Sequence, residues 1–177
     1  MSELFVTVDM LNDFIRPAGK LYFPKGQAVI EPLARLKRAF RARKAPVLYV
    51  NDAHPEDSDE FSAWPPHCLI GSWGAGIVEE LSPEPGDLVL LKDSLTLFSV
   101  PTAERLLRGL GVTHLYLAGV ATEYCVQACA LDAVSRGLRV TVAQNSIASV
   151  DIKENDGEQA LAAAGRRVLR GIGRAGR

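Results

Sequence analysis

The sequence lacks the features of several protein classes. Its 177 residues include three cysteines, an odd number that gives no disulfide framework. No apolar run is long enough to cross a membrane, and Glu3 and Asp9 interrupt the N-terminus too early for a secretory signal. The net charge of −1 gives no reason to expect nucleic acid or a membrane as a partner. We therefore expect a cytoplasmic protein with free thiols.

Short apolar stretches alternate with segments of helical periodicity along the chain. The apolar stretches are nearly continuous, which is typical of strands buried on both faces of a parallel sheet. The alternation predicts an α/β fold with a mostly parallel sheet, and the length predicts a single domain over residues 1–177. The expected strands are Leu4–Val8, Val47–Val50, Leu88–Leu91, His114–Ala118 and Leu138–Val142, and the expected helices are Ala28–Arg43, Thr102–Leu110, Thr122–Arg136 and Glu158–Leu169.

The segment Asn51–Pro85 departs from this alternation. It is rich in Pro, Gly, His, Asp and Glu, and its one helical candidate is the short stretch Gly74–Leu81. Loops this long inside a compact domain are usually functional or disordered. Both tryptophans and two of the three histidines lie in it, which argues against disorder.

Chemically reactive side chains follow four of the expected strands. Asp9 closes the first strand, and Asp52 closes the second with His54 just beyond it. Lys92 follows the third strand, and Cys125 follows the turn after the fourth. Ligands bind at the carboxyl ends of the strands in open parallel sheets. The sequence therefore predicts that two carboxylates, an imidazole, an amine and a thiol meet at one edge of the sheet.

Cys125 is the candidate nucleophile. If Thr122 is the N-cap of the following helix, Cys125 lies in its first turn, where the helix end and a nearby Lys92 would favour the thiolate. Asp9 is then the candidate general base. The structural alternative is a buried core cysteine, as we expect for Cys129. In that case Asp9 caps the following turn and Lys92 is a surface residue.

The spacing Asp52-Ala53-His54 places two potential metal ligands on the same side of an extended chain. His67 follows 13 positions after His54, and Glu60 lies between the two histidines. Two imidazoles and a carboxylate suit zinc, iron or manganese with open coordination positions. The alternative is a polar loop with unrelated histidines.

Three aromatic residues, Phe14, Trp64 and Tyr124, lie close in sequence to these candidates. They could enclose a planar ring, and the alternative is that each packs in the protein interior.

Four motifs, in order along the chain, carry a resemblance to a known family. Val8–Phe14 is similar to Val-Asp-Met-Gln-Asn-Asp-Phe, Asp52–Pro55 to Asp-Trp-His-Pro, Trp64–Cys68 to Trp-Pro-x-His-Cys, and Gly119–Val126 to Gly-x-Ala-Thr-Asp-Tyr-Cys-Val. Together they resemble the motifs of the isochorismatase-like cysteine hydrolase superfamily, and within it those of the nicotinamidases and pyrazinamidases, from Val8 to about Asp151.

The resemblance implies a three-layer α/β/α fold of the Rossmann type and a metal-assisted cysteine amidohydrolase. The implied substrate is a small carboxamide, nicotinamide or pyrazinamide, and the implied cofactor is one divalent metal, zinc before iron or manganese. Relatives also associate, so a homo-oligomer is a possible state. The alternatives are a relative acting on another small amide, ureido or carbamoyl substrate, and a catalytically silent binding or redox protein.

The resemblance also assigns roles to matching positions. It makes Cys125 the nucleophile, with Asp9 as general base and Lys92 as the third catalytic residue. It implies a cis peptide bond between Val120 and Ala121, and an oxyanion hole formed by the amides of Ala121 and Cys125. The implied metal ligands are Asp52, His54 and His67, with Glu60 as a further candidate, and the substrate-binding residues are Phe14, Trp64 and Tyr124.

The chain departs from the family pattern at four positions, none of which removes a catalytic group. Leu11 stands where Gln is usual, and Ala53 stands where Trp is usual. Glu123 replaces an Asp, and Asp93 follows Lys92 where Gly is common. These changes leave the implied reaction type intact, but the implied substrate depends on them more than the reaction type does.

Overall fold

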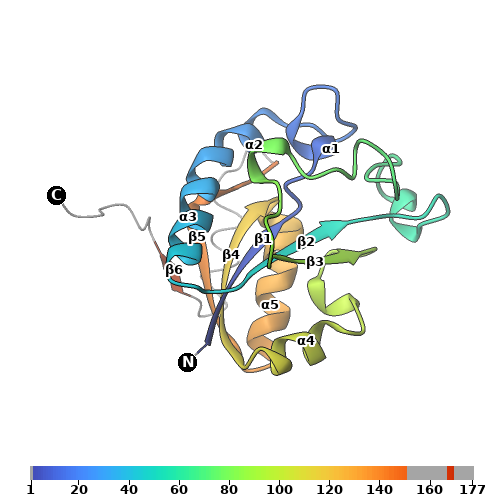
Figure 1. Ribbon diagram of the computed structural model, residues 1–177. Helices are drawn as coiled ribbons and strands as arrows, with labels where there is room; N and C mark the ends of the chain where they lie inside the picture. The colour runs from blue at the N-terminus through green and yellow to red at the C-terminus, as the bar shows by residue number, and fades with distance from the viewer. Residues whose placement is uncertain (1, 151–166, 170–177) are drawn as a thin grey trace.

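The structure is a computed structural model that describes residues 2–150 and 167–169 (Figure 1). Its strands are β1 (Ser2–Val8), β2 (Val47–Asp52), β3 (Leu88–Lys92), β4 (Val112–Val120), β5 (Arg139–Ala148) and β6 (Arg167–Leu169). Its α-helices are α1 (Asn12–Ile15), α2 (Pro24–Ala28), α3 (Ile30–Ala42), α4 (Ala103–Gly109) and α5 (Gln127–Ser135). Three short 3₁₀ turns, η1 (Asp59–Ser62), η2 (Glu79–Leu81) and η3 (Leu97–Ser99), and a π-helix, η4 (Thr122–Val126), complete the described elements.

The strands form one sheet in the order β3-β2-β1-β4-β5-β6. Every neighbouring pair in the described part of the chain is parallel. The chain begins in the middle of the sheet, builds outward to β3, and then returns to β4 beside β1. The predicted α/β class and parallel sheet are therefore confirmed.

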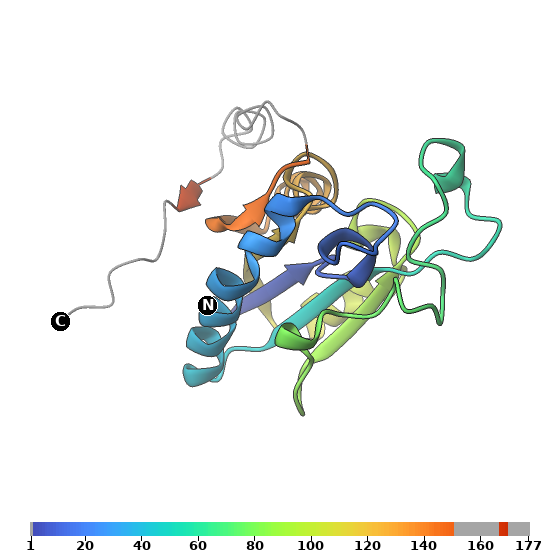
Figure 2. The same cartoon turned by 90° about the horizontal axis from the view of Figure 1, so that it is seen from above.

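Helices cover both faces of this sheet (Figures 1 and 2). Successive residues of β1 point to opposite faces, as a strand requires. Leu4, Val6 and Val8 belong to the apolar cluster that includes residues of α4 and α5. Phe5 belongs to the cluster on the other face, where its ring stacks on Phe40 of α3 with 5.1 Å between centroids. Side chains of β1 thus pack into an apolar core on each face of the sheet, and helices cover both cores to give three layers.

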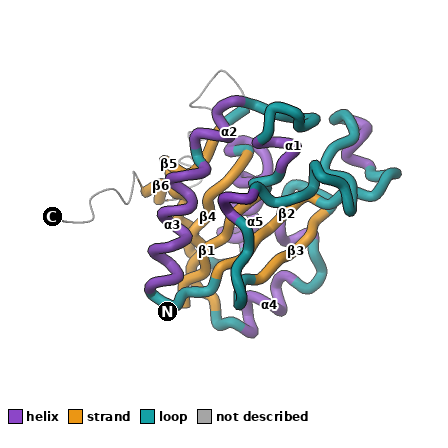
Figure 3. Tube along the Cα trace, turned by 45° about the horizontal axis from the view of Figure 1, so that its top comes forward, coloured by secondary structure: helices purple, strands orange, loops and turns teal. Residues whose placement is uncertain are grey.

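The loops that matter for function lie beyond the carboxyl ends of the strands (Figure 3). The longest begins after β2 and ends before β3, and Figure 1 shows its first half projecting from the end of β2. Among the described residues, no helix combines the length and apolarity needed to cross a bilayer.

The predicted helix Gly74–Leu81 is wrong except for the 3₁₀ turn η2 at its end. Backbone groups that would bond within a helix bond instead to the α1 region. The carbonyl oxygens of Gly74 and Gly76 accept hydrogen bonds from the amides of Asp13 and Asn12, at 3.0 and 2.9 Å. Tertiary pairing thus replaces the local helix.

The predicted helix Glu158–Leu169 is wrong at its end, because Arg167–Leu169 forms strand β6, paired with β5. The rest of that prediction lies outside the described residues. Thr122 is also not the N-cap: Ala121 holds that position, without a side-chain cap, and Thr122 is the first residue of η4.

Gly119 is needed where β4 passes β1. Its φ is +123°, and a Cβ atom there would lie 2.0 Å from the carbonyl oxygen of Val8. We expect Gly119→Ala to lower the free energy of unfolding by about 3 kcal/mol, because it combines backbone strain with a clash against backbone. Denaturant unfolding measures this change.

Gly109→Ala is the matched control, since its Cβ would meet no atom within 4 Å. It should leave the free energy of unfolding within about 1 kcal/mol of the wild type. Equal losses in the two variants would contradict the close approach of β4 to β1.

Candidate active site

Lys92 is the centre of a buried polar cluster at the ends of four strands. Its Nζ lies 2.9 Å from Asp9 Oδ2 and donates a very short hydrogen bond to Asp52 Oδ1. The same nitrogen lies 3.5 Å from Cys125 Sγ. All four side chains are buried. The edge-of-sheet convergence expected from the sequence is therefore present, with Lys92 buried rather than on the surface.

The backbone fixes the two carboxylates. Asp9 follows β1 in a left-handed conformation (φ 50°), which aspartate tolerates better than most residues. Its Oδ1 accepts a hydrogen bond from the Asp52 amide at 2.7 Å, while its Oδ2 faces Lys92. Strand register sets Lys92 opposite Asp52, since these two residues pair between β2 and β3. Both carboxylates are thus placed by the sheet itself.

Cys125 is presented by the π-helix η4 directly after β4. Single-turn π-helices occur frequently at functional sites. The peptide bond Val120–Ala121, just before η4, is cis, as the resemblance implies. The amides of both Tyr124 and Val126 reach the Ala121 carbonyl oxygen at 3.2 Å. These two hydrogen bonds hold the conformation of the turn that presents the Cys125 sulfur.

The cluster does not favour a resting thiolate, which corrects the expectation from the helix end and Lys92. Burial raises the pKa of Cys125 well above its usual range; Lys92 lowers it, but Asp9 and Asp52 raise it further. Burial and the Asp52 charge also raise the pKa of Asp9 to about 6, against the lowering influence of Lys92. The thiol proton therefore stays on sulfur, beside a carboxylate whose proton affinity is enhanced.

Lys92 remains the cation of the cluster. Burial lowers its pKa, but Asp9, Cys125 and Asp52 raise it, and the net result is a pKa well above the usual value. Asp9, Asp52 and Cys125 also lie close enough together to share a metal ion. The Lys92 ammonium contacts all three of them, so this set already has its cation.

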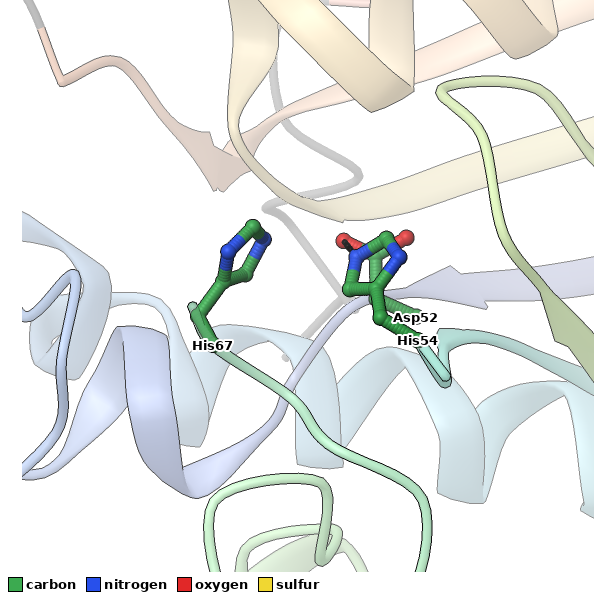
Figure 4. Close-up of side chains that lie close together, drawn as sticks. All are labelled: Asp52, His54 and His67. Atoms are coloured by element: carbon green, nitrogen blue, oxygen red, sulfur yellow. Dashed lines mark ion pairs between the residues drawn. The ribbon is translucent and has the colours of Figure 1, made fainter. Parts of the chain in front are cut away.

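A second set of ligand atoms lies next to this cluster. Single ligand atoms of Asp52, His54 and His67 all lie within 4.8 Å of one another, and all three residues are buried. Figure 4 shows the His54 ring beside the Asp52 carboxylate, with His67 reaching in from the following loop. The two imidazole centroids are 4.7 Å apart.

Both imidazoles have one nitrogen engaged and one left for a ligand. His67 Nδ1 donates to the Pro65 carbonyl oxygen at 2.9 Å, so its Nε2 carries the lone pair. His54 Nε2 is buried and has no hydrogen-bond partner among the described residues. Its nearest carboxylate oxygen, Asp52 Oδ2, is 3.7 Å away. An orphaned buried nitrogen facing a carboxylate and a second imidazole fits a bound divalent metal.

Glu60 does not belong to that trio. It lies in η1 and lines the same cavity, but it is absent from the group of ligand atoms within mutual reach. The sequence spacing that proposed it as a further ligand places it at the cavity wall instead.

Asp9, Asp52, Cys125 and His67, which belong to these two clusters, line one cavity of about 90 Å³. All three predicted aromatic residues line it. Trp64 and Tyr124 meet edge to face, with centroids 5.2 Å apart and planes at 87°. The Phe14 ring lies edge-on to His67 at 5.6 Å. The cavity thus has reactive groups on its floor and aromatic rings on its walls.

Asp13 joins the two loops that form this wall. Its Oδ2 accepts a hydrogen bond from the Cys68 amide at 2.7 Å, and its Oδ1 accepts one from the Lys20 amide at 3.0 Å. Gly74 is required beside it, since a Cβ atom at that position would lie 2.1 Å from Asp13 Oδ2. The cavity residues Phe14 and His67 are direct chain neighbours of this bond.

Comparison with known proteins agrees with this architecture. The isochorismatase domain family matches residues 3–169. The chain belongs to the isochorismatase family. It is 27% identical to the nicotinamidase of Escherichia coli over 185 residues, which cover 87% of this chain and 86% of that protein.

Two solved structures of family members are also similar. N-carbamoylsarcosine amidase from Thermoplasma acidophilum has a TM-score of 0.90 and 31% identity, covering 99% of this chain and 100% of that one. Pyrazinamidase of Pyrococcus horikoshii in complex with zinc has a TM-score of 0.87 and 30% identity, covering 96% of this chain and 99% of that one. The chain is an isochorismatase-family hydrolase, and the predicted resemblance is confirmed.

Some residues of this isochorismatase-family site were missed in the sequence. Leu21, Leu95 and Val150 line the cavity, and nothing in their apolar character separates them from core residues. Asp93 and Ser58, which contact His54, were also missed as site residues. The one signal for Asp93 was its position directly after Lys92, at the end of an expected strand.

Proposed function

We propose that the protein is a metal-assisted cysteine amidohydrolase that converts nicotinamide, and pyrazinamide, to the corresponding acid and ammonia. The observation that carries this proposal is the contact of Lys92 with Asp9, Asp52 and Cys125 beside the Asp52–His54–His67 trio. A thiol, a base and a cation are the groups that acyl transfer through a thioester needs. The trio would hold a metal that adds a second point of contact for the substrate. This activity would place the chain in cytoplasmic NAD salvage.

Asp9 and Cys125 carry the chemistry of the first half-reaction. Asp9 accepts the thiol proton as the sulfur attacks the amide carbon, which suits a base whose pKa is raised to about 6. The amides of Ala121 and Cys125 stabilise the oxyanion. The C–N bond then breaks as Asp9 returns the proton to the leaving nitrogen, and ammonia and a thioester result.

The second half-reaction uses the same groups. Asp9 takes a proton from water as the water oxygen attacks the thioester carbon. The C–S bond breaks, the acid leaves, and the proton returns to Cys125. Lys92 stays charged throughout and holds Asp9 in reach of the sulfur.

Asp52, His54 and His67 would hold one divalent metal, and zinc is the first candidate because the similar pyrazinamidase was solved with zinc. When bound, the metal would offer a coordination position to the pyridine nitrogen of the substrate. Phe14, Trp64 and Tyr124 would pack against the aromatic ring. Glu60, at the cavity wall and outside the ligand trio, would face the substrate.

An ammonia-release assay with and without chelator tests the proposal. We expect turnover of nicotinamide and pyrazinamide, loss of most of this activity after treatment with chelator, and recovery when zinc is restored. An aliphatic amide such as butyramide should be turned over far more slowly, because it has no ring nitrogen. Chelator-resistant activity, or no turnover of either heteroaromatic amide, would contradict the assignment.

A carbamoyl or ureido amide is the second candidate substrate. N-carbamoylsarcosine amidase is 31% identical over nearly the whole chain, and the Glu60 carboxylate at the cavity wall suits the N–H donors of a ureido group. N-carbamoylsarcosine and ureidoacrylate therefore belong in the same screen. Turnover of one of these without turnover of nicotinamide would favour this candidate.

A further inference from the structure

Asp93 lies beside the metal-site trio but outside it. It follows the last residue of β3, and its Oδ1 is 2.5 Å from His54 Nδ1. The same oxygen accepts a hydrogen bond from Ser58 Oγ at 2.6 Å. Both contacts are made by the carboxylate, so the network depends on the side chain at position 93.

The contact decides which nitrogen of His54 is left for a metal. A carboxylate at neutral pH only accepts hydrogen bonds, so His54 Nδ1 must carry the hydrogen. In the neutral ring, Nε2 then keeps its lone pair. That atom is the buried nitrogen that faces Asp52 and lacks a hydrogen-bond partner in the described part of the chain.

We propose that Asp93 is a positioning residue that holds His54 in the tautomer and ring orientation needed to ligate the metal, with Ser58 holding Asp93. This inference rests on the metal site proposed above. Carboxylates that accept the second N–H of a ligating histidine raise its basicity and fix its orientation. Asp93 would do so here from β3, a neighbouring strand of the same sheet.

Ser58 extends the network to the loop that covers the trio. Its Oγ accepts a hydrogen bond from the Glu60 amide at 3.3 Å, and it is the N-cap of η1. The next residue of η1, Phe61, lies edge-on to His54 and His67 at 5.6 and 5.9 Å. The Asp93–Ser58 bond thus ties the end of β3 to the loop that packs on both imidazoles.

Zinc affinity, measured by competition with a chromogenic chelator, tests the role of Asp93. Asp93→Ala should weaken zinc binding by about 10- to 100-fold. Asp93→Asn should weaken it less, because its amide oxygen can still accept the His54 N–H. Asp57→Asn is the matched control: it removes one charge from an exposed residue beside Ser58, and it should leave zinc affinity unchanged.

The tautomer of His54 gives a readout that does not depend on zinc. Nitrogen-15 NMR of the metal-free protein should show His54 protonated on Nδ1 in the wild type and in Asp93→Asn. Asp93→Ala should show a mixture of tautomers or protonation on Nε2. Circular dichroism checks that each variant is folded, and the Asp93 side chain is 44% exposed, which favours folding of all of them.

The outcomes separate this inference from the metal site itself. Wild-type zinc affinity in Asp93→Ala, or an equal loss in Asp57→Asn, would overturn the role of Asp93 and leave the site standing. A wild type that binds zinc no better than His54→Ala would remove the site, and the inference with it. A wild-type His54 whose neutral ring carries its hydrogen on Nε2 would also overturn the inference.

Discussion

Cys125→Ala is expected to reduce ammonia release from nicotinamide by about 10⁴-fold or more, because Cys125 would form the acyl-enzyme and is the only thiol among the described residues that line the cavity. The substitution removes one sulfur that contacts Lys92 and leaves the Asp52–His54–His67 trio in place. Zinc affinity should therefore stay at the wild-type value. A steady-state ammonia assay and a chelator competition on the same protein measure the two properties.

Cys129→Ser is the matched control for this variant. Cys129 is also buried, one helical turn later, but its Sγ accepts a hydrogen bond from the Leu97 amide at 3.2 Å, a role that serine can take. This variant should keep most of the activity. Wild-type turnover in Cys125→Ala would refute the thioester mechanism.

A nicotinaldehyde-type electrophile separates an enzyme from a silent relative. It should form an adduct with the wild type and with Cys129→Ser, and none with Cys125→Ala. Failure of the wild type to form the adduct, together with no turnover in the screen, would support a binding or redox protein on this scaffold.

Lys92→Met is expected to lower the free energy of unfolding by about 3–5 kcal/mol at pH 7, in addition to abolishing activity. Methionine keeps the shape of the side chain but leaves Asp9 and Asp52 buried without their cation. Removing one partner of a buried ionic cluster costs more than the cluster contributes, because the remaining charges stay desolvated. Denaturant unfolding measures the change.

An exposed ion pair gives the control for Lys92. Arg38 faces Glu31 at 3.4 Å, and their side chains are 62% and 66% exposed. Arg38→Met should change the free energy of unfolding by no more than about 0.5 kcal/mol. If Lys92→Met were no more destabilising than Arg38→Met, the buried cluster would not be held together as described.

The centre of the sheet could be predicted from the sequence because strands such as β2 are buried on both faces. Val47–Val50 is a continuous apolar run, and all of β2 is buried. The carboxyl ends of parallel strands meet at one edge of the sheet, so the sequence also predicts that Asp9, Asp52 and Lys92 lie close together. The strand pattern alone does not give the register between β2 and β3, which the structure shows to pair Lys92 with Asp52.

Other features depend on contacts that leave no local pattern. A π-helix of five residues, η4, is too short to differ visibly from α-helical periodicity, so Thr122 was misplaced as an N-cap. Asp93 and His54 are 39 residues apart and meet just beyond the paired ends of β2 and β3, but no local pattern indicates that their side chains contact each other. The resting state of Cys125 depends on how deeply it is buried, and burial outweighs the nearby ammonium.

The Asp13 bond has a consequence for ligand binding. Because one carboxylate accepts both the Lys20 and Cys68 amides, the loop after β1 and the loop before β3 are clamped to each other without any ligand. Phe14 and His67, which line the cavity and contact each other edge to face, are thus held in place before a ligand arrives, and a ligand that packs against them would cost little loop entropy. Binding at this wall would then require no closure of one loop onto the other.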